Sequence, residues 1–505
     1  MEDINYRVVD MDAKWRIIRR HWRFAFWAVW VSLGPMMIGF DSVAGGQLIA
    51  MPAFQQKYAG DFFGALICGY LMDYTGRKRS VLLAATISCV GIGLQYVSAT
   101  WRVFFAGKFI NGIAFGIWFT VAPTWIGENA RPECRGFFLC LYNSSIVYGQ
   151  ALVVFISKGL VRIPGKWSFQ STILLQFLFP ALGYAGYLFF AESPYWLLSR
   201  DMDDDARKAL RKLYGSNYQE FRDIEFDRLS ENVRFSTNLR RMANEGGLAV
   251  LKCFRGTNLK RTMTSLLAAA GQQLLGASFV LGYVTYFLEL VHVENTFLVT
   301  VILFVVMIIS TTSTFVLIEI LGRRTLLVPA TFVLTFILLL IGIMGCIPNQ
   351  VAAGWVITVC IFIWGAIYQL SLGSTGFVMA SELSTLTLRA QTQSLVAATD
   401  SVVAGISGFT IPYMINPDAG NMGGKVGFVF FAMGVFVCIG YYFFIPETKG
   451  LSFDDMDWLY AQKVSPRKFQ EAIKDRIGSD GGVWRTVTAV EKVVADAKET
   501  HIEHV

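Results

Sequence analysis

Charge and histidine are scarce in this chain. Of its 505 residues only 16% are charged and 54% are hydrophobic, whereas soluble globular proteins carry about 25% charged residues. It has four histidines and no Gly-x4-Gly-Lys-Ser/Thr loop of the kind that binds nucleotide phosphates. The eight cysteines show no paired spacing, which argues against a disulfide framework or a metal site. The composition argues against a soluble or ATP-driven enzyme. It predicts an all-α membrane protein without cofactor, metal or nucleic-acid partner.

Long uncharged runs are abundant instead. A helix needs about 20 apolar residues to cross a bilayer, and eleven segments approach or exceed that length: 24–50, 80–99, 103–126, 137–159, 170–190, 264–290, 296–320, 325–346, 352–380, 391–415 and 425–446. Between the first two lies a shorter apolar run, 62–73, which is too short to cross in the normal way. The chain is therefore expected to pass through the lipid bilayer many times.

Basic residues decide whether the short run also crosses. Lys and Arg cluster before the first apolar segment, at 77–79, at 131 and 135, throughout 191–263, at 323–324 and at 389. The positive-inside rule places all of them in the cytoplasm, which is possible only if 62–73 crosses as the second of twelve spans. Both termini are then cytoplasmic, in a protein expected to be a plasma-membrane monomer.

The twelve spans divide into two six-helix halves. The predicted organisation is a cytoplasmic segment 1–23, a first bundle 24–190, a cytoplasmic linker 191–263, a second bundle 264–446 and a cytoplasmic tail 447–505. Within the linker, Asp204 to Leu213 is expected to form a short surface helix. In the tail, Phe453 to Tyr460 is expected to form an amphipathic helix, and the rest is expected to be mobile.

Short charged motifs occur twice, about 250 residues apart, each at the end of an apolar segment. Gly76-Arg77-Lys78 recurs as Gly322-Arg323-Arg324. Glu128 followed by Arg135 recurs as Glu382 followed by Arg389, and Glu192-Ser193-Pro194 recurs as Pro446-Glu447-Thr448. A duplicated membrane protein with charged motifs on one face is typical of a secondary transporter.

The order and spacing of the motifs resemble the sugar porter family of the major facilitator superfamily. Six motifs over about residues 25–460 carry the resemblance: Asp73-x-x-Gly76-Arg77-Lys78, Glu128-x6-Arg135-Gly136, Glu192-Ser193-Pro194, Gln272-Gln273-x-x-Gly276, Ser381-Glu382-x6-Arg389 and Pro446-Glu447-Thr448-Lys449-Gly450. Gly282-Tyr283-x-Thr285-Tyr286-Phe287 and Pro412-Tyr413-Met414-x-Asn416-Pro417 make it most similar to fungal maltose and general α-glucoside permeases. The resemblance implies the major facilitator fold.

The charged motifs are interpreted as a cytoplasmic gate. Opposite charges on neighbouring helix ends can pair when that side is closed and separate when it opens. The alternative is that they only anchor the topology, but acidic residues add nothing to a positive-inside bias. The predicted gate residues are Asp73, Arg77, Glu128, Arg135, Glu192, Glu319, Arg323, Glu382, Arg389 and Glu447.

One ionisable residue, Asp41, lies inside the first apolar segment. An ionisable side chain inside a membrane span costs free energy, and it usually faces a cavity or a partner. The resemblance implies that Asp41 takes up a transported proton, with Lys108 at the position of the family's usual Arg. A carboxylate facing a cation can alternate between a charged pair and a protonated, released state. Alternatively, Asp41 caps an irregular helix at the outer interface.

Amide side chains within the spans are the candidate sugar contacts. Each buried sugar hydroxyl needs a hydrogen-bond partner, and an adjacent Gln pair begins span seven. Amides can also serve as plain helix–helix contacts. The predicted substrate residues are Gln150, Gln272, Gln273, Ser278, Tyr283 and Phe377.

Several positions depart from the family pattern. Ser278 replaces an Asn, Phe377 replaces a Trp, and Asp400 stands near where an Asn is common. Lys108 in place of Arg loses bidentate pairing. About twenty residues are missing between Lys57 and Phe62, judged by the length that a span requires. Span two is therefore expected to be truncated, and the chain is expected to fold and transport poorly.

The function that these features favour is proton-coupled uptake of an α-glucoside such as maltose. A facilitative hexose or polyol uniporter, or a carrier of a sugar-like acid, is the alternative within transport. A non-transporting membrane sugar sensor is the alternative from another class. The polar tail after the last span has under 60 residues, and sensors tend to have long tails, so transport is favoured.

Overall fold

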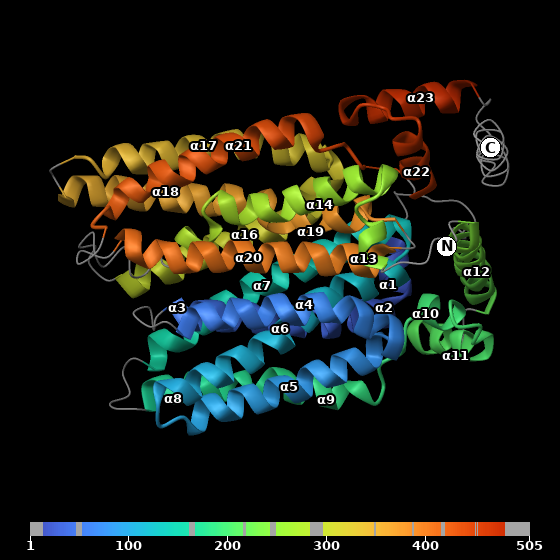
Figure 1. The fold of residues 1–505 in the computed structure, drawn as a ribbon, viewed down its shortest axis with the longest axis horizontal. Helices are drawn as coiled ribbons and strands as arrows, with labels where there is room; N and C mark the ends of the chain where they lie inside the picture. The colour runs from blue at the N-terminus through green and yellow to red at the C-terminus, as the bar shows by residue number, and fades with distance from the viewer. Residues whose placement is uncertain are drawn as a thin grey trace.

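The computed structural model describes residues 14–46, 53–160, 167–215, 219–242, 249–282, 296–347, 350–385, 388–415, 420–449, 451 and 453–479. Within these ranges every element is helical. Figure 1 shows the long helices in two adjacent layers, with α3 to α9 in one layer and α14 to α21 in the other. The predicted all-α architecture of two helical halves is confirmed.

The first half begins with a helix that is interrupted once. Its elements are α1 (Lys14–Arg20), α2 (Trp22–Val31), α3 (Leu33–Gly46), α4 (Ala53–Thr75), α5 (Arg77–Val97), α6 (Trp101–Asn129), α7 (Pro132–Leu160), α8 (Trp167–Gln176) and α9 (Leu178–Tyr187). Ser32 separates α2 from α3, and its hydroxyl donates to the Ala28 carbonyl oxygen at 2.8 Å. Such back-bonding of Ser to the preceding turn is associated with bends in helices.

The second half repeats this plan. Its elements are α14 (Gly256–Leu274), the π-helix η2 (Ser278–Gly282), α16 (Thr296–Leu321), α17 (Arg323–Met344), α18 (Gln350–Leu370), α19 (Leu372–Leu383), α20 (Arg389–Ile415), the 3-10 turn η4 (Gly423–Lys425) and α21 (Val426–Phe444). The helix α14 starts before the apolar segment predicted from 264. Its first turns carry Lys260 and Arg261, which the apolar pattern cannot include.

Nine helices in the described part of the chain are long and apolar enough to cross a membrane. The other three expected spans correspond to α4, to α8 with α9, and to α14 with η2. Each falls short either in unbroken helix length or in apolar content. Polar residues open α4, Phe177 interrupts the span of α8 and α9, and charged residues begin α14. Large side chains such as Ile309, Ile406 and Phe436 are exposed on the outer faces, as contact with lipid requires.

The helix α4 corrects the expectation of a short second span. It contains 23 residues, which at 1.5 Å per residue gives about 35 Å, enough to cross about 30 Å of hydrocarbon. The shortage lies in apolar residues and not in helix length. The helix continues upstream of the apolar run through Gln55, Gln56 and Lys57, which hydropathy alone excludes from a span.

Two helix pairs make the largest contacts between the halves. In one, α4 of the first half packs against α20 of the second, and in the other α7 packs against α16. Small groups allow the close approach. The Ser394 hydroxyl on α20 accepts from the Gly69 backbone N–H on α4 at 3.2 Å, and Ser144 on α7 bonds to Thr311 on α16 at 2.9 Å. Close helix contacts through Gly, Ser and Thr are the usual packing mode in membranes.

Polar helices gather at one end of the bundle, which we call the motif end. They are α10 (Pro194–Leu198), α11 (Asp203–Tyr214), α12 (Gln219–Met242) and α13 (Ala249–Lys252) from the linker, and α22 (Phe453–Ala461) and α23 (Phe469–Ser479) from the tail. In Figure 1 the linker and tail helices lie on the right. The predicted helices at 204–213 and 453–460 are confirmed. The tail was expected to be mobile beyond 460, but α23 follows, and its Arg476 pairs with Asp455 at 3.5 Å.

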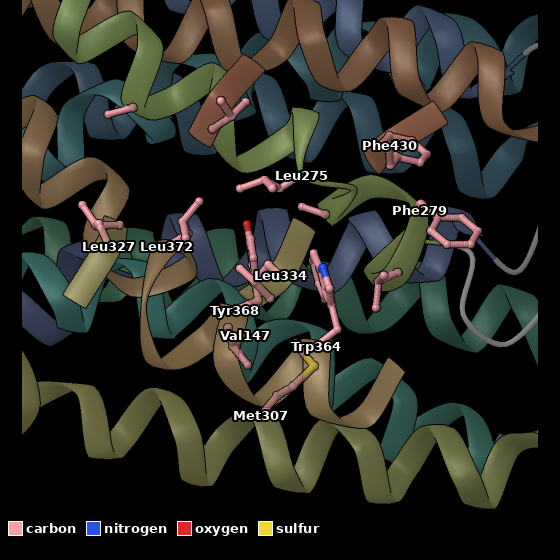
Figure 2. Packing of buried hydrophobic residues seen from close by; sticks show 14 of the residues in the cluster. Val147, Leu275, Phe279, Met307, Leu327, Leu334, Trp364, Tyr368, Leu372 and Phe430 are labelled. Carbon is pink, nitrogen blue, oxygen red and sulfur yellow. The ribbon is translucent and has the colours of Figure 1, made fainter. Parts of the chain in front are cut away.

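Aromatic side chains fill the core of the second half. Figure 2 shows Trp364 and Tyr368 of α18 in one cluster with Leu275, directly after α14, and with Phe279 of η2 and Phe430 of α21. The Trp364 and Tyr368 rings stack with centroids 4.7 Å apart, and the rings of Phe279 and Phe430 stack at 5.7 Å. Because Tyr368 also lines the central cavity, this packing holds one wall of the candidate site in place.

Candidate functional site

A cavity of about 160 Å³ lies between the two halves. Four predicted substrate residues line it: Gln150 from α7, Gln272 and Gln273 from α14, and Ser278 from η2. Apolar side chains, among them Phe115, complete the wall. Amides beside aromatic rings can bind the hydroxyls and the apolar face of a sugar at the same time.

Hydrogen bonds within the protein hold the three predicted substrate side chains of the second half, Gln272, Gln273 and Ser278, in place. The Gln273 amide nitrogen donates to Asp400 Oδ1 at 3.1 Å, and the Ser278 hydroxyl donates to Gln273 Oε1 at 2.7 Å. The Gln272 amide nitrogen donates to the Leu372 carbonyl oxygen at 2.8 Å. A Cβ at Gly376 would lie 1.8 Å from the Gln272 amide nitrogen, so only glycine leaves room for this side chain.

Two other predicted substrate residues are not placed as side chains. Tyr283 lies outside the described residues. Phe377 belongs to α19, but its side chain is not described. The structure therefore brings together four of the six predicted residues.

The cavity also contains polar residues that were not predicted as substrate contacts. They are Ser42, Asp61, Asn143, Gln369, Asp400 and Ser401. Asn143 joins the halves, because its amide nitrogen donates to the Ser374 carbonyl oxygen at 2.8 Å. The sequence feature that could have identified Asn143 is that it is the single Asn inside the apolar run 137–159. Asp400 was noted only as a departure from the family pattern.

The Asp41 carboxylate and the Lys108 ammonium meet inside the first half. Lys108 Nζ on α6 lies 2.5 Å from Asp41 Oδ1 on α3, and the two residues are 6% and 0% exposed. The Gln176 amide nitrogen at the end of α8 donates to the same carboxylate oxygen at 2.8 Å. Desolvating both charges is costly, and the ion pair with its additional hydrogen bond offsets that cost. Gln176 was not predicted, although it is an amide inside the apolar run 170–190.

The motif end of the first half is a buried cluster of charges. Arg77 pairs with Glu128, with both side chains 4% exposed, and lies 3.9 Å from Asp73. Glu192 Oε1 accepts from the backbone N–H of Arg77 at 2.8 Å. Gly76 makes this possible, because its φ is +88° and a Cβ there would lie 2.4 Å from Glu192 Oε2. The carboxylate also sits at the N-terminus of α5, where the helix dipole stabilises it.

The second half builds the same cluster. Arg323 pairs with Glu382 at 2.8 Å, with side chains 9% and 14% exposed. Glu447 accepts from the Arg323 backbone N–H at 2.9 Å, and the Thr448 hydroxyl donates to Glu382 at 2.5 Å. Gly322 has a φ of +90°, and a Cβ there would lie 2.5 Å from Glu447. The predicted gate residue Glu319 lies in α16, but its side chain is not described.

Most of these charged contacts join helices within one half. Contacts across the halves come from other groups. Arg389 on α20 donates to the Gly127 carbonyl oxygen on α6 at 2.9 Å, and the Gln391 amide donates to Asp73 at 2.6 Å. Gly136 of the first half packs closely against Arg323 of the second, because a Cβ at Gly136 would lie 2.6 Å from Arg323 Nη2. Arg135 donates to Ala130 within its own half at 3.4 Å.

Two titratable groups beside the bundle have shifted pKa values. Burial lowers the pKa of His21 from 6.5 to about 4, and the charges of Arg20 and Arg131 add to this effect. The His21 ring stacks on Phe221 of α12 with centroids 4.2 Å apart. Burial raises the pKa of Glu192, while its bonds to backbone N–H groups oppose the rise.

Known proteins match this chain over most of its length. Residues 57–460 match the family described as "Sugar (and other) transporter". The major facilitator-type transporter ecdD of Aspergillus rugulosus is 27% identical, over 86% of this chain and 87% of the relative. A general alpha-glucoside permease of Saccharomyces cerevisiae is 24% identical, over 90% of this chain and 78% of the relative.

A sensor and a solved transporter are also similar. The high glucose sensor RGT2 of Saccharomyces cerevisiae is 26% identical, over 89% of this chain and 62% of the sensor. The proton:xylose symporter XylE, solved with 6-bromo-6-deoxy-D-glucose, superposes with a TM-score of 0.72 at 19% identity, over 88% of this chain and 99% of XylE. At that identity the superposition shows that the folds agree.

Proposed function

Since the chain belongs to the sugar (and other) transporter family, whose members are membrane transporters and not enzymes, we propose that it takes up an α-glucoside such as maltose by proton symport across the plasma membrane. The observation that carries this proposal is a buried carboxylate–cation pair, Asp41 and Lys108, beside a cavity lined by amides from both halves. The similar α-glucoside permease supports the substrate class.

The amides supply the substrate contacts in this proposal. Gln150 approaches the cavity from the first half, and Gln272 and Gln273 approach from the second. A sugar held between them contacts both halves, so that its binding favours the arrangement in which they are closest. A ligand that binds one arrangement better shifts the population toward it, and this is what alternating access requires.

Proton coupling is assigned to the pair on α3 and α6. Ile38 and Ser42 flank Asp41 on α3, and both line the cavity. Protonation of Asp41 would break its ion pair with Lys108 and change the packing of α3 beside the substrate. The proton and the sugar would thereby act on the same helix.

The gate is assigned to the motif end. The buried clusters of each half hold their own helices together, while Arg389 and Gln391 join the halves. Opening this end would break the Arg389 and Gln391 bonds and leave each cluster intact. Rigid bundles that rock against each other need only such a small set of exchangeable contacts.

The test is uptake of radiolabelled maltose and glucose in a cell that lacks its own sugar transporters. We expect accumulation of maltose that a protonophore abolishes. Equilibration without accumulation, insensitive to the protonophore, would favour the alternative of a facilitative hexose or polyol uniporter.

A non-transporting sensor is the second candidate, because a glucose sensor is among the similar proteins. A sensor would bind sugar without moving it, and it would not need the buried Asp41–Lys108 pair. Sugar binding by the purified protein, together with no uptake by cells that display it at the surface, would favour the sensor.

A further inference from the structure

Each half places a basic side chain on the ring of a tyrosine at the motif end. In the first half the Lys78 ammonium lies 4.7 Å from the centre of the Tyr187 ring. In the second half the Arg467 guanidinium lies 4.4 Å from the centres of the Tyr442 and Phe443 rings. The two tyrosines each stand five residues before the Glu of the last motif of their half. The duplication that relates the two halves therefore also repeats this arrangement.

A second basic residue lies near each of these cations. Arg324 of α17 donates to the Tyr442 carbonyl oxygen at 2.7 Å, and it is close enough to Arg467 for the two charges to interact. In the first half, the charge of Lys212 on the linker helix α11 acts on Lys78 in the same way. Like charges held together cost free energy unless an anion faces them. Each half thus combines one cation from a span with one cation from a polar segment outside the bundle.

The carboxylate beside each pair of cations is bound to backbone groups. Glu192 accepts from the Lys78 backbone N–H at 3.1 Å, and Glu447 accepts from the Arg324 backbone N–H at 3.0 Å. None of the four basic side chains forms an ion pair with a described residue. Two cations and one carboxylate leave a net positive charge at each place, which suits a bound anion.

The surroundings of the two places decide which anion fits. Exposed apolar side chains follow each tyrosine: Leu188 and Phe189 are 73% and 69% exposed, and Phe443 and Phe444 are 51% and 56% exposed. At the end of a membrane span such side chains contact lipid. A soluble phosphate would gain nothing from them, whereas the acyl chains of a phospholipid would. The positive-inside rule predicts that the motif end lies at the cytoplasmic leaflet, which contains the anionic lipids.

We propose that each half binds the headgroup of one anionic phospholipid at the motif end. Lys78 and Lys212 hold the headgroup in the first half, and Arg324 and Arg467 hold it in the second. This site lies outside the sugar cavity, and the inference does not depend on which sugar is carried. Because Lys212 belongs to the linker and Arg467 to the tail, the lipid ties these polar segments to the membrane surface beside each bundle.

The experiment titrates the purified full chain in a neutral detergent with phosphatidylserine or with phosphatidylcholine of the same acyl chains. Native mass spectrometry counts the bound lipids and measures the affinity of each. We expect two molecules of phosphatidylserine that bind more tightly than phosphatidylcholine. Equal binding of the two lipids would overturn the inference. Soluble glycerophosphoserine that binds as tightly as phosphatidylserine would show that the acyl chains contribute nothing, and would overturn the assignment to a membrane lipid.

Two variants locate the sites. Arg467→Gln and Lys212→Gln each remove the charge of an exposed side chain. Each should weaken the binding of one of the two phosphatidylserine molecules by about fivefold, the effect of one basic residue near an anionic surface, and leave the other unchanged. Arg467→Lys keeps the charge and should keep the lipid.

Matched controls remove an exposed charge nearby. Lys208→Gln lies on the same helix as Lys212, and Lys474→Gln lies on α23, shortly after Arg467. Both should leave the two affinities unchanged. If these controls weaken binding as much as the site variants do, the lipid is attracted by the overall charge of the surface and the two proposed sites are wrong.

Discussion

The two halves of the protein are nearly alike at the motif end and different at the centre of the bundle. Each motif end has an Arg–Glu ion pair, a second Glu that accepts from the backbone at a helix start, and a Gly with positive φ beside it. At the centre, the first half has the Asp41–Lys108 pair, while the second half has Asp400 bonded to the Gln273 amide. The shared end serves the architecture, and the divergent centre carries the proposed proton coupling and substrate binding.

This difference has a physical basis. The motif-end cluster depends on local geometry at helix ends, where a Gly turn exposes N–H groups to a carboxylate. That geometry can be duplicated with the sequence. A charge buried within a span is tolerated only with a specific partner or function, so each half is free to differ there. Four predictions test how far the contrast extends.

The largest effect is expected at the centre of the first half. Asp41→Asn should abolish accumulation against a gradient and leave exchange of sugar across the membrane, because the group that takes the proton is gone. Asp400→Asn should still allow accumulation of a neutral sugar, since the concentration ratio reached across the membrane depends on coupling and not on affinity. Accumulation and counterflow in cells with matched surface expression measure both.

The double variant Asp41→Asn with Lys108→Gln is the control for an unpaired buried cation. It should show the same loss of coupling with better folding. Unchanged proton-driven accumulation in Asp41→Asn would remove this residue from the mechanism, and loss of accumulation in Asp400→Asn would mean that both centres are coupled.

The motif-end clusters should differ in strength despite their common design. Arg77→Ala leaves a carboxylate unpaired in the more deeply buried cluster and should destabilise the protein by about 3–5 kcal/mol. Arg323→Ala should cost less, because Glu382 is 14% exposed against 4% for Glu128. Thermal unfolding in detergent compares them, with Lys208→Ala in an exposed ion pair as the control. Equal losses would show that burial does not distinguish the two clusters.

Substrate binding should depend on both halves. Gln273→Ala should weaken sugar binding by about 1–3 kcal/mol, the cost of leaving buried polar groups unpaired, and Gln150→Ala should act in the same direction from the other half. Equilibrium binding to the purified protein is the measurement. If both single variants bind normally, the pocket lies elsewhere.

The smallest effect concerns the linker helices that cover the first half. His21 packs neutral against Phe221, with its pKa lowered from 6.5 to about 4. The unfolded chain therefore binds more protons, and stability should fall as the pH drops from about 6.5 toward 4, by about 1–2 kcal/mol at pH 5. His21→Phe keeps an aromatic ring and should remove this part of the pH dependence of unfolding. If the free energy of unfolding depends on pH in the same way in both proteins, the pH dependence does not come from His21.

Part of this outcome could be predicted from the sequence. The duplicated motifs and apolar runs predicted the helical halves, and the four cavity residues Gln150, Gln272, Gln273 and Ser278 were predicted from motif positions. Gln176, Asn143 and Gln369 were missed as site residues, because an amide in an apolar run gives no information on which cavity or partner it faces. The length of α4 was also misjudged, since hydropathy measures apolar content and a helix can continue through polar residues.

The sequence by itself determined the class, the duplication and the family, because hydropathy, charge placement and motif spacing are properties of the chain read in order. Only the tertiary structure decided which charges meet. It paired Arg77 with Glu128 and Arg323 with Glu382 inside each half, placed Arg389 in contact with the other half, and brought Asp61 and Asp400 into one cavity. The physical reason is that a helix fixes the direction of a side chain only relative to its own axis, while partners across helices are set by how the helices pack together.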